Sequence, residues 1–401
     1  MTKTMQVKMK ADVDLIAREV PSQRVVEIAL TAPEASTDHK RFPLNLGLVL
    51  DRSGSMGGDK IEQAKLTLKR IIEQMGDGDV VSVVAFDDSI RVIANNYALS
   101  KHNREGLIHD IEQIRAGGST NLTDGWLTGC NSVAEGPSGN YIKRALLVSD
   151  GLANVGITDH TEIFHHASAI FERGITTSTF GVGEGFDEHL LEGMANKGGG
   201  NFTYIESASV IDGLILAEFK DLVTVTARNV TVEIILPAGV SGTVPGEWTM
   251  KKEGNKIFIS LSDQSAMRTT TLFLKLLTPP GDGELVIETK VTYEDENGKK
   301  QKASCDLAIK YAAEEKVLKA QKDQDLLTRY AAVETGEKMN EALKMERAGR
   351  RMDAQKLMRQ TLAEYGPDMP IPTRERYEAL SNRIDRGLEE GASRFGRVRE
   401  A

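Results

Sequence analysis

The stretch Leu44-Asn-Leu-Gly-Leu-Val-Leu-Asp51-Arg-Ser53-Gly-Ser55-Met56 joins a run of apolar residues to a short polar turn. The run is typical of a strand that is buried on both faces of a sheet. Apolar residues then recur at helical spacing before the stop signal Gly76, at Ile61, Ala64, Leu68, Ile71, Ile72 and Met75. Open α/β sheets bind ligands outside the carboxyl ends of their strands. The polar turn is therefore a candidate site.

The alternation of short apolar runs with amphipathic helical stretches continues from Phe42 to Ile205. It predicts an α/β fold with a doubly wound, mostly parallel sheet covered by helices on both faces. The further strand-like runs are Val80–Phe86, Ala145–Val148, Thr176–Val182 and Phe202–Ile205. Ile90–Ile93 follows a strand after too few residues for a right-handed crossover, so we expect an antiparallel edge strand joined by a hairpin.

Alternating patterns on either side of this region predict a second, all-β unit. From Leu222 onward apolar and polar residues alternate between turns rich in Gly and Pro, which is typical of a small sandwich. Gln6–Leu15 and Arg24–Leu30 have the same strand-like character but no obvious partner in the α/β region. We therefore expect these N-terminal strands to complete the later sandwich, with the α/β domain inserted in it.

The C-terminal region changes character again. After Tyr311 the chain is rich in Ala, Glu, Lys, Leu and Met, which favours helices, and Ala348-Gly-Arg marks a break between two of them. Residues 313–401 carry 18 Lys and Arg against 17 Asp and Glu, so they are neither a polybasic arm nor an acidic tail. The boundaries we predict are 1–40 and 216–312 for the β-sandwich, 41–215 for the α/β domain and 313–401 for the helical region.

Composition excludes several classes of protein. Of the 401 residues, 40% are hydrophobic and 27% are charged, as in ordinary globular proteins, and the net charge of −9 argues against a nucleic-acid partner. The two cysteines, Cys130 and Cys305, are too few and too far apart for a disulfide framework or a cysteine-based zinc site. The N-terminus lacks the apolar run of a secretory signal. We expect a cytoplasmic protein that does not insert directly into a membrane.

Two carboxylates should meet at the carboxyl edge of the sheet. Asp51 and Asp150 each end an apolar run. Two carboxylates at such a short distance repel each other unless a cation lies between them. Ser53 and Ser55 add hydroxyl oxygens, and Gly54 lets the turn between them bend. These donors are hard oxygens, which favour Mg²⁺ or Mn²⁺ over zinc or copper.

A third loop, Gly117-Gly-Ser-Thr120-Asn-Leu-Thr-Asp-Gly, brings Thr120 to the same edge. Asp51-x-Ser53-x-Ser55, Thr120 within Gly-Gly-Ser-Thr-Asn, and Asp150-Gly together resemble the metal-ion-dependent adhesion site of von Willebrand factor type A domains. The resemblance covers roughly residues 41–215. It implies direct contacts of the metal with the two serines, and a contact with Thr120 directly or through water. It also implies that the two aspartates act mostly through water or by hydrogen-bonding the hydroxyls.

The resemblance implies a protein-binding module and not an enzyme. The metal would keep one coordination position open, which an Asp or Glu side chain of a partner protein fills. This arrangement, a domain of this type inserted in a sandwich, resembles that of bacterial cytosolic or surface proteins with the same domain. It is also similar to the calcium-activated chloride channel-like and inter-alpha-trypsin inhibitor heavy chain families. Those relatives are mostly adhesion or assembly factors.

Other interpretations of these residues remain open at this stage. Asp51 and Asp150 could be plain helix N-caps, although that explains one loop better than three loops in the right order. A metal-dependent hydrolase could use Ser53 or Ser55 as nucleophile, or a metal-activated water for phosphate hydrolysis. Against it, no His or Lys lies near either serine in the sequence to act as base, and no Gly-x-Ser-x-Gly elbow is present. A scaffold with an unused metal site is the third alternative. Gly181-Val-Gly-Glu-Gly lacks the spacing of a phosphate loop and is predicted to be a turn.

Overall fold

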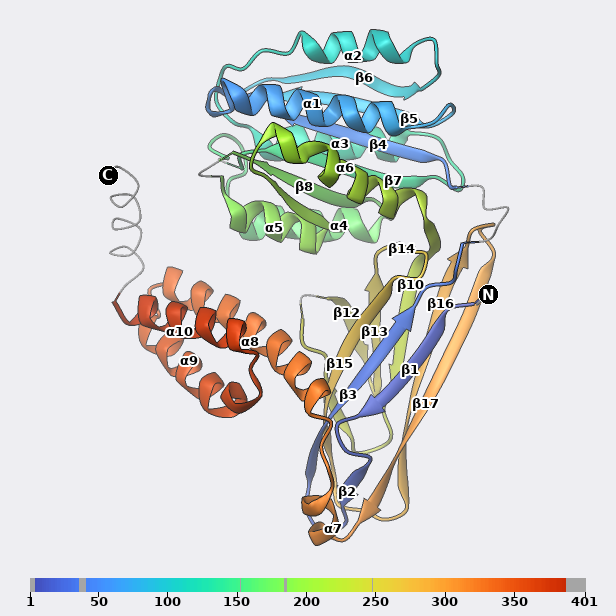
Figure 1. The fold of residues 1–401 in the computed structure, drawn as a ribbon, viewed down its shortest axis with the longest axis vertical. Coiled ribbons are helices and arrows are strands. Elements are labelled where there is room, and N and C mark those ends of the chain that lie inside the picture. The colour runs from blue at the N-terminus through green and yellow to red at the C-terminus, as the bar shows by residue number, and fades with distance from the viewer. Residues whose placement is uncertain (1–3, 36–40, 152, 184–185, 247, 387–401) are drawn as a thin grey trace.

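The structure is a computed structural model that describes residues 4–35, 41–151, 153–183, 186–246 and 248–386. An α/β domain lies at one end of a long β-sandwich, and a group of helices lies along one side of the sandwich (Figure 1). The fold class predicted from the sequence is confirmed in these three parts, because the mostly parallel sheet, the sandwich and the C-terminal helices are all present.

The α/β domain is built on a six-stranded sheet with the order β6-β5-β4-β7-β8-β9. Its strands are β4 (Leu44–Asp51), β5 (Val80–Phe86), β6 (Ile90–Ala98), β7 (Ile142–Ser149), β8 (Thr176–Val182) and β9 (Gly199–Ile205). Every residue of β4 is buried, as expected for a strand covered on both faces. The strand pairs are parallel except that of β6 with β5, which confirms the predicted antiparallel edge strand.

Helices cover both faces of this sheet. They are α1 (Asp59–Gln74), α2 (Arg104–Glu112), α3 (Leu122–Glu135), α4 (His160–Glu172), α5 (Glu188–Lys197) and α6 (Ala208–Val223). One apolar cluster joins α1, α2 and α6 to the sheet, and a second joins α3, α4 and α5 to its other face. A short 3-10 turn, Gly54–Met56, connects β4 to α1 and carries part of the predicted site.

The last helix of the domain requires a correction to the sequence analysis. The apolar residues Leu222 and Val223 were expected to open the first strand of the sandwich, but they end α6. Phe219 and Leu222 pack in the core of the α/β domain, so that domain extends past the expected boundary at residue 215. A short apolar window cannot distinguish the buried face of a helix from a strand. Strand pairing with the sandwich begins only at Val225.

The sandwich combines strands from both ends of the insertion. Its four-stranded sheet has the order β1-β3-β15-β11, and its larger sheet follows the path β12-β13-β10-β16-β17-β2, with β14 pairing β10. The strands before the insertion are β1 (Gln6–Ala11), β2 (Leu15–Ala17) and β3 (Ser22–Thr31). Those after it are β10 (Val225–Ile235), β11 (Ser241–Thr243), β12 (Thr249–Glu253), β13 (Lys256–Leu261), β14 (Gln264–Ser265), β15 (Thr269–Thr278), β16 (Glu284–Asp295) and β17 (Lys300–Ala312). Strands from before the α/β domain pair with strands from after it: β3 pairs with β15 along the whole length of both strands, and β2 pairs with the end of β17.

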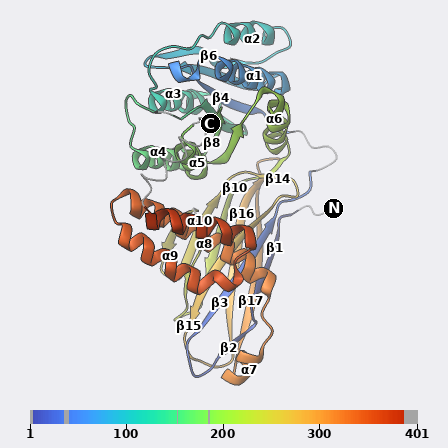
Figure 2. The same ribbon diagram turned by 60° about the vertical axis from the view of Figure 1, so that its left-hand side comes forward.

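Of the C-terminal helices, α8 packs against the face formed by β3 and β15, α9 and α10 pack beside α8, and α7 lies next to β2 at the end of the sandwich (Figure 2). They are α7 (Glu314–Lys319), α8 (Gln324–Arg347), α9 (Arg351–Tyr365) and α10 (Ile371–Arg386). The turn between α8 and α9 is the break predicted at Ala348-Gly-Arg. Leu326 and Tyr330 of α8 share an apolar cluster with Val25 of β3 and Phe273 of β15. In the described part of the chain, no helix is long and apolar enough to span a membrane.

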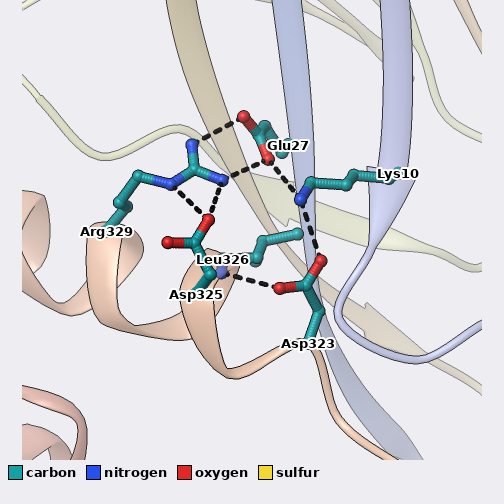
Figure 3. Close-up of polar contacts among 6 residues, drawn as sticks. All are labelled: Lys10, Glu27, Asp323, Asp325, Leu326 and Arg329. Carbon is teal, nitrogen blue, oxygen red and sulfur yellow. Dashed lines mark hydrogen bonds and ion pairs between the residues drawn. The ribbon is translucent and has the colours of Figure 1, made fainter.

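The first turns of α8 are fixed to the sandwich by charged groups (Figure 3). The Arg329 guanidinium donates two hydrogen bonds to Glu27 of β3, at 2.6 and 2.8 Å. Asp323 accepts a hydrogen bond from Lys10 of β1 at 2.8 Å and also caps the helix by accepting the Leu326 N–H at 2.9 Å. The hydrogen bonds from Arg329 hold the pKa of the buried Glu27 below its ordinary value of 4.5, although burial opposes this.

Replacing Arg329 by Gln should loosen the start of α8. Loss of a two-bond contact to a buried carboxylate is expected to lower the opening free energy of this turn by about 1–3 kcal/mol at pH 7. Because the pKa of Glu27 is lowered in the fold, the contribution is full above pH 4.5 and is lost as the pH falls below it. Hydrogen exchange over residues 324–330 measures both effects.

The matched control is Arg374→Gln, which breaks an exposed pair with Glu378 on α10 and should change exchange by less than about 0.5 kcal/mol. Equal protection of residues 324–330 in wild type and Arg329→Gln at pH 7 would contradict the assigned role of the Glu27 contact.

A close approach of α3 to the sheet fixes the loop that precedes this helix. A Cβ atom added at Gly125 would lie 2.3 Å from Phe86 Cγ, and one at Gly129 would lie 2.3 Å from Val49 Cγ2. Both distances are shorter than any tolerable contact, so the helix can lie this near β4 and β5 only with glycine at these positions. The start of α3 at Leu122, and with it the position of Thr120, depends on this packing.

Replacing Gly125 by Ala should destabilise the α/β domain by about 1–3 kcal/mol through overpacking, despite the better helix propensity of alanine. The control Gly106→Ala on α2 has no atom within 4 Å of the new Cβ and should be neutral or stabilising by up to about 1 kcal/mol. Urea unfolding followed by the fluorescence of Trp126, in a Trp248→Phe background, reports on α3 itself. Equal stability of the two variants would show that α3 can shift freely.

Candidate metal centre

The register of the central strands places the two predicted aspartates side by side in the sheet. Leu50 of β4 pairs with Val148 of β7, and both strands run in the same direction. Asp51 is the last residue of β4, and Asp150 follows the last residue of β7. Both aspartates are fully buried, Ser53 and Thr120 are 1% exposed, and Ser55 is exposed. The five predicted residues thus lie on loops at one edge of the sheet.

Backbone hydrogen bonds join the first loop to the second. The Gly54 N–H donates to Gly118 O at 2.9 Å, and the Gly117 N–H donates to Arg52 O at 2.8 Å. Gly118 adopts a φ of 74°, and a Cβ atom there would lie 2.9 Å from Asp87 Oδ2. Glycine is therefore required at this point of the second loop.

The second loop is joined to the third by Asn154. Its Oδ1 atom accepts the Thr120 N–H at 2.8 Å, while the N–H groups of Asn154 and Val155 donate to Thr120 O at 3.1 Å. The backbone of Thr120 is thus held on both sides. The three loops that the sequence analysis assigned to one site are in mutual contact in the structure.

Asp51 is held in one orientation by its neighbours. Its Oδ1 atom accepts the Ser53 N–H at 2.8 Å, and its Oδ2 atom accepts the Ser149 hydroxyl at 2.5 Å. Burial raises the pKa of Asp51 to about 6, even though these hydrogen bonds favour the charged form, and the nearby charge of Asp150 adds to the increase. A buried carboxylate is costly to ionise without a counter-charge, and a bound cation would supply that charge.

Asp150 lacks such a complete set of partners. Its Oδ2 atom lies 3.1 Å from the ammonium group of Lys60, at the start of α1. Its Oδ1 atom is buried and has no hydrogen-bond partner among the residues that the structure describes. The Ser53 and Ser55 hydroxyl oxygens lie 3.1 Å apart. A buried carboxylate oxygen without a donor is costly, and it has the environment of an atom that binds a cation or a polar ligand.

These donors fit a magnesium or manganese ion. Two carboxylates and three hydroxyl groups supply only hard oxygens, and the partnerless Asp150 Oδ1 has the character of a ligand atom or of an acceptor for metal-bound water. In the described residues, no group of three or more His, Cys, Asp or Glu side chains is placed to hold a metal. A site in this part of the chain would therefore depend on the serine and threonine hydroxyls.

Sequence reasoning missed three side chains around the site. Ser149 could have been found from its place before Asp150 at the end of a strand, whereas nothing in the sequence indicated Asn154. Lys60 was overlooked because only residues directly beside the serines were considered as basic neighbours. Near the second loop, Asp87 pairs with Arg52 at 2.8 Å. Burial opposes ionisation of Asp87, but hydrogen bonds from Ser89 and the charge of Arg52 lower its pKa.

Other patterns in the sequence have structural roles. Gly181 and Val182 end β8, and Gly183 follows with a φ of 72°, while Glu184 and Gly185 of the predicted turn lie outside the described residues. His165 is exposed and His166 half-buried on α4, with ring centroids 6.5 Å apart. Cys130 is a buried free thiol whose pKa burial raises to about 12.

The site lies away from the junction with the sandwich. The chain enters β4 at Leu44 and leaves the domain at the end of α6, and both points are at the amino-terminal edge of the parallel strands. Figure 1 shows the sandwich connected at that side of the domain. Asp51 and Asp150 lie at the opposite, carboxyl-terminal edge. The sandwich therefore leaves the site open to a partner.

Comparison with known proteins assigns the class of the α/β domain. Residues 45–215 match the von Willebrand factor type A domain family. Together with the sheet order and the three loops, this match shows that the chain contains a von Willebrand factor type A domain. The resemblance of this region to a von Willebrand factor type A domain is therefore confirmed.

Relatives in bacteria and animals share parts of this chain. Protein sll0103 of Synechocystis sp. is 26% identical over 300 residues, which cover 71% of this chain and 69% of that protein. Inter-alpha-trypsin inhibitor heavy chain H1 of Bos taurus is 23% identical over 228 residues, covering 55% of this chain but only 25% of that protein. The likeness to the heavy chain is thus limited to part of a longer protein.

Solved structures share the fold well beyond the α/β domain. A von Willebrand factor type A protein from Catenulispora acidiphila superimposes with a TM-score of 0.70 at 17% identity, covering 92% of this chain and 88% of that one. The ArnB paralog VWA2 from Sulfolobus acidocaldarius gives a TM-score of 0.59 at 18% identity, covering 94% and 93%. At these identities the likeness concerns the fold alone.

Replacing Ser149 by Ala should destabilise the domain by about 1–3 kcal/mol, because it leaves an oxygen of the buried Asp51 carboxylate without its donor. The same change removes the acceptor of the Gly151 N–H. Denaturation in the presence of a chelator measures the loss. The control Ser138→Ala, at an exposed position of the same domain, should stay within about 0.5 kcal/mol of wild type. A Ser149→Ala variant as stable as the control would show that Asp51 does not depend on this hydroxyl.

Proposed function

We propose that this protein binds a partner protein through a Mg²⁺ or Mn²⁺ ion held at the site of Asp51, Ser53, Ser55, Thr120 and Asp150. The observation that carries the proposal is the buried Asp150 Oδ1 atom, which lies at the meeting point of three joined loops and has no partner in the described part of the chain. Support comes also from the family, since residues 45–215 are a von Willebrand factor type A domain, a class that commonly mediates protein–protein interaction.

Each of the five residues has a separate role in this proposal. Ser53, Ser55 and Thr120 bind the metal through their hydroxyls, while Asp51 orients Ser53 through its backbone N–H. Asp150 balances the charge of the ion. The bound ion supplies a positive charge with one open position, which takes an Asp or Glu carboxylate of the partner.

Small side chains around the site leave room for such a carboxylate. The exposed residues of the first two loops are mainly glycines and serines, namely Gly54, Ser55, Gly57, Gly58, Gly118 and Ser119. A single charge-assisted contact contributes roughly 1.5–3 kcal/mol, so the partner must also contact the surface around the loops. That wider surface would choose among carboxylate-bearing partners.

A binding role agrees better with the contacts than hydrolysis does. The Ser53 hydroxyl lies 3.1 Å from the Ser55 hydroxyl, and the amine of Lys60 is paired with Asp150. A nucleophilic serine needs a base within hydrogen-bond reach, and neither contact supplies one. A scaffold with an unused metal site would have the same geometry, so experiment must separate it from a working site. The cytoplasmic location also stays a prediction.

The proposal predicts that partner capture needs both the metal and its hydroxyl ligands. Affinity capture from the native cell with wild-type protein should retain a partner in Mg²⁺ and lose it in chelator. Thr120→Ala and Ser53→Ala should weaken capture in Mg²⁺ by about ten- to a hundredfold, the equivalent of one charge-assisted contact. Magnesium titration calorimetry of the same variants should show weaker binding of the ion.

The control for this experiment is Thr128→Ala, on α3 but beyond the loop, where the hydroxyl donates to a helix carbonyl. It should capture the partner as wild type does. Capture that persists unchanged in chelator would refute the proposal and move attention to another surface, such as the helices after residue 313. Magnesium binding without metal-dependent capture would favour the unused scaffold.

A further inference from the structure

Lys60 is the basic residue in contact with the candidate site. It is the second residue of α1 and follows the exposed Gly57-Gly58 turn. Its Nζ atom lies 3.1 Å from Asp150 Oδ2, and its side chain is 24% exposed. A Cβ atom added at Gly183 would lie 2.7 Å from Lys60 Cε. The aliphatic part of the side chain therefore lies against the loop after β8, at a position that only glycine allows.

The ammonium group provides the positive charge next to Asp150. That carboxylate is fully buried, with one oxygen near Lys60 and the other without a partner among the described residues. The buried carboxylate of Asp51 lies at the end of the neighbouring strand β4, on the same edge of the sheet. A cation at hydrogen-bond distance in a buried environment interacts strongly with a carboxylate, because solvent screens the pair poorly. A divalent ion brought to the same group of oxygens would meet this ammonium.

We propose that Lys60 is a built-in competitor of the metal ion: its ammonium group holds Asp150 when the site is metal-free and is displaced when the ion binds. The proposal rests on the function proposed above and adds a residue that controls metal affinity. Two cations that share one carboxylate repel each other, so each weakens the binding of the other.

The side chain has the freedom that this exchange requires. Lysine has a flexible stem with a compact, strongly hydrated charge, and the partial exposure of Lys60 gives the ammonium a route to water. The pair with Asp150 also limits the cost of leaving that carboxylate buried in the metal-free protein. Lys60 thus has two effects: it stabilises the metal-free fold and it raises the metal concentration at which the site fills.

The test compares magnesium titration calorimetry of wild type, Lys60→Met and Lys60→Arg in the full chain. Met keeps the length and apolar stem of lysine without the charge, so the dissociation constant for Mg²⁺ should fall roughly tenfold or more. Arg keeps the charge and should stay within about threefold of wild type. The control Lys69→Met removes the same charge about 14 Å further along α1, from an exposed pair with Glu112, and should bind as wild type does.

Thermal unfolding gives a readout that does not require a partner. In chelator, Lys60→Met should unfold at a lower temperature than wild type, because Asp150 has lost its counter-charge. Saturating Mg²⁺ should raise the unfolding temperature of Lys60→Met more than that of wild type. Lys69→Met should show neither effect.

The outcomes separate this inference from the proposed function. Tighter Mg²⁺ binding in Lys60→Met than in wild type and Lys69→Met supports the competitor role, even if wild type binds too weakly to measure. Equal or weaker binding in Lys60→Met, with magnesium binding intact in wild type, overturns it and leaves the metal site standing. Absence of Mg²⁺ binding in every variant, Lys60→Met included, overturns both.

Discussion

The hydrogen bond from the Ser149 hydroxyl to Asp51 joins the ends of the two central strands, and the arrangement of the site depends on it. It orients Asp51, whose other oxygen then accepts the Ser53 N–H and fixes the first loop. Backbone hydrogen bonds then join the first loop to the loop of Thr120, and Asn154 joins the loop of Thr120 to the loop after β7. Two carboxylates can be kept in so buried a place only where the surroundings supply donors or cations.

The rest of the molecule serves to present this edge of the sheet. Close packing of α3 through Gly125 and Gly129 sets the loop of Thr120, while both connections to the sandwich lie at the opposite edge. The helical region is fixed to the sandwich by Arg329 and Glu27 and by an apolar cluster.

The contact between Lys60 and Asp150 cannot be predicted from the sequence motif of the site. The spacing of Asp51, Ser53 and Ser55 predicts a shared site, and the structure places their loop in contact with the loop of Thr120. The same motif does not reveal that an ammonium group lies 3.1 Å from one of those carboxylates. The contact depends on the direction of α1 relative to the loop at Gly183, and both are set by packing in the core.

The sequence by itself determined the class of fold and the order of the three loops, and it predicted five residues of a metal site, whose binding of an ion stays a prediction. Periodicity and motif order are properties of the linear chain, and the carboxyl ends of parallel strands always meet at one edge. Only the tertiary structure decided that α6 continues through Leu222, that Asn154 holds Thr120, and that Lys60 pairs with Asp150. These contacts join residues far apart in sequence, and their partners are chosen by packing, which no local pattern records.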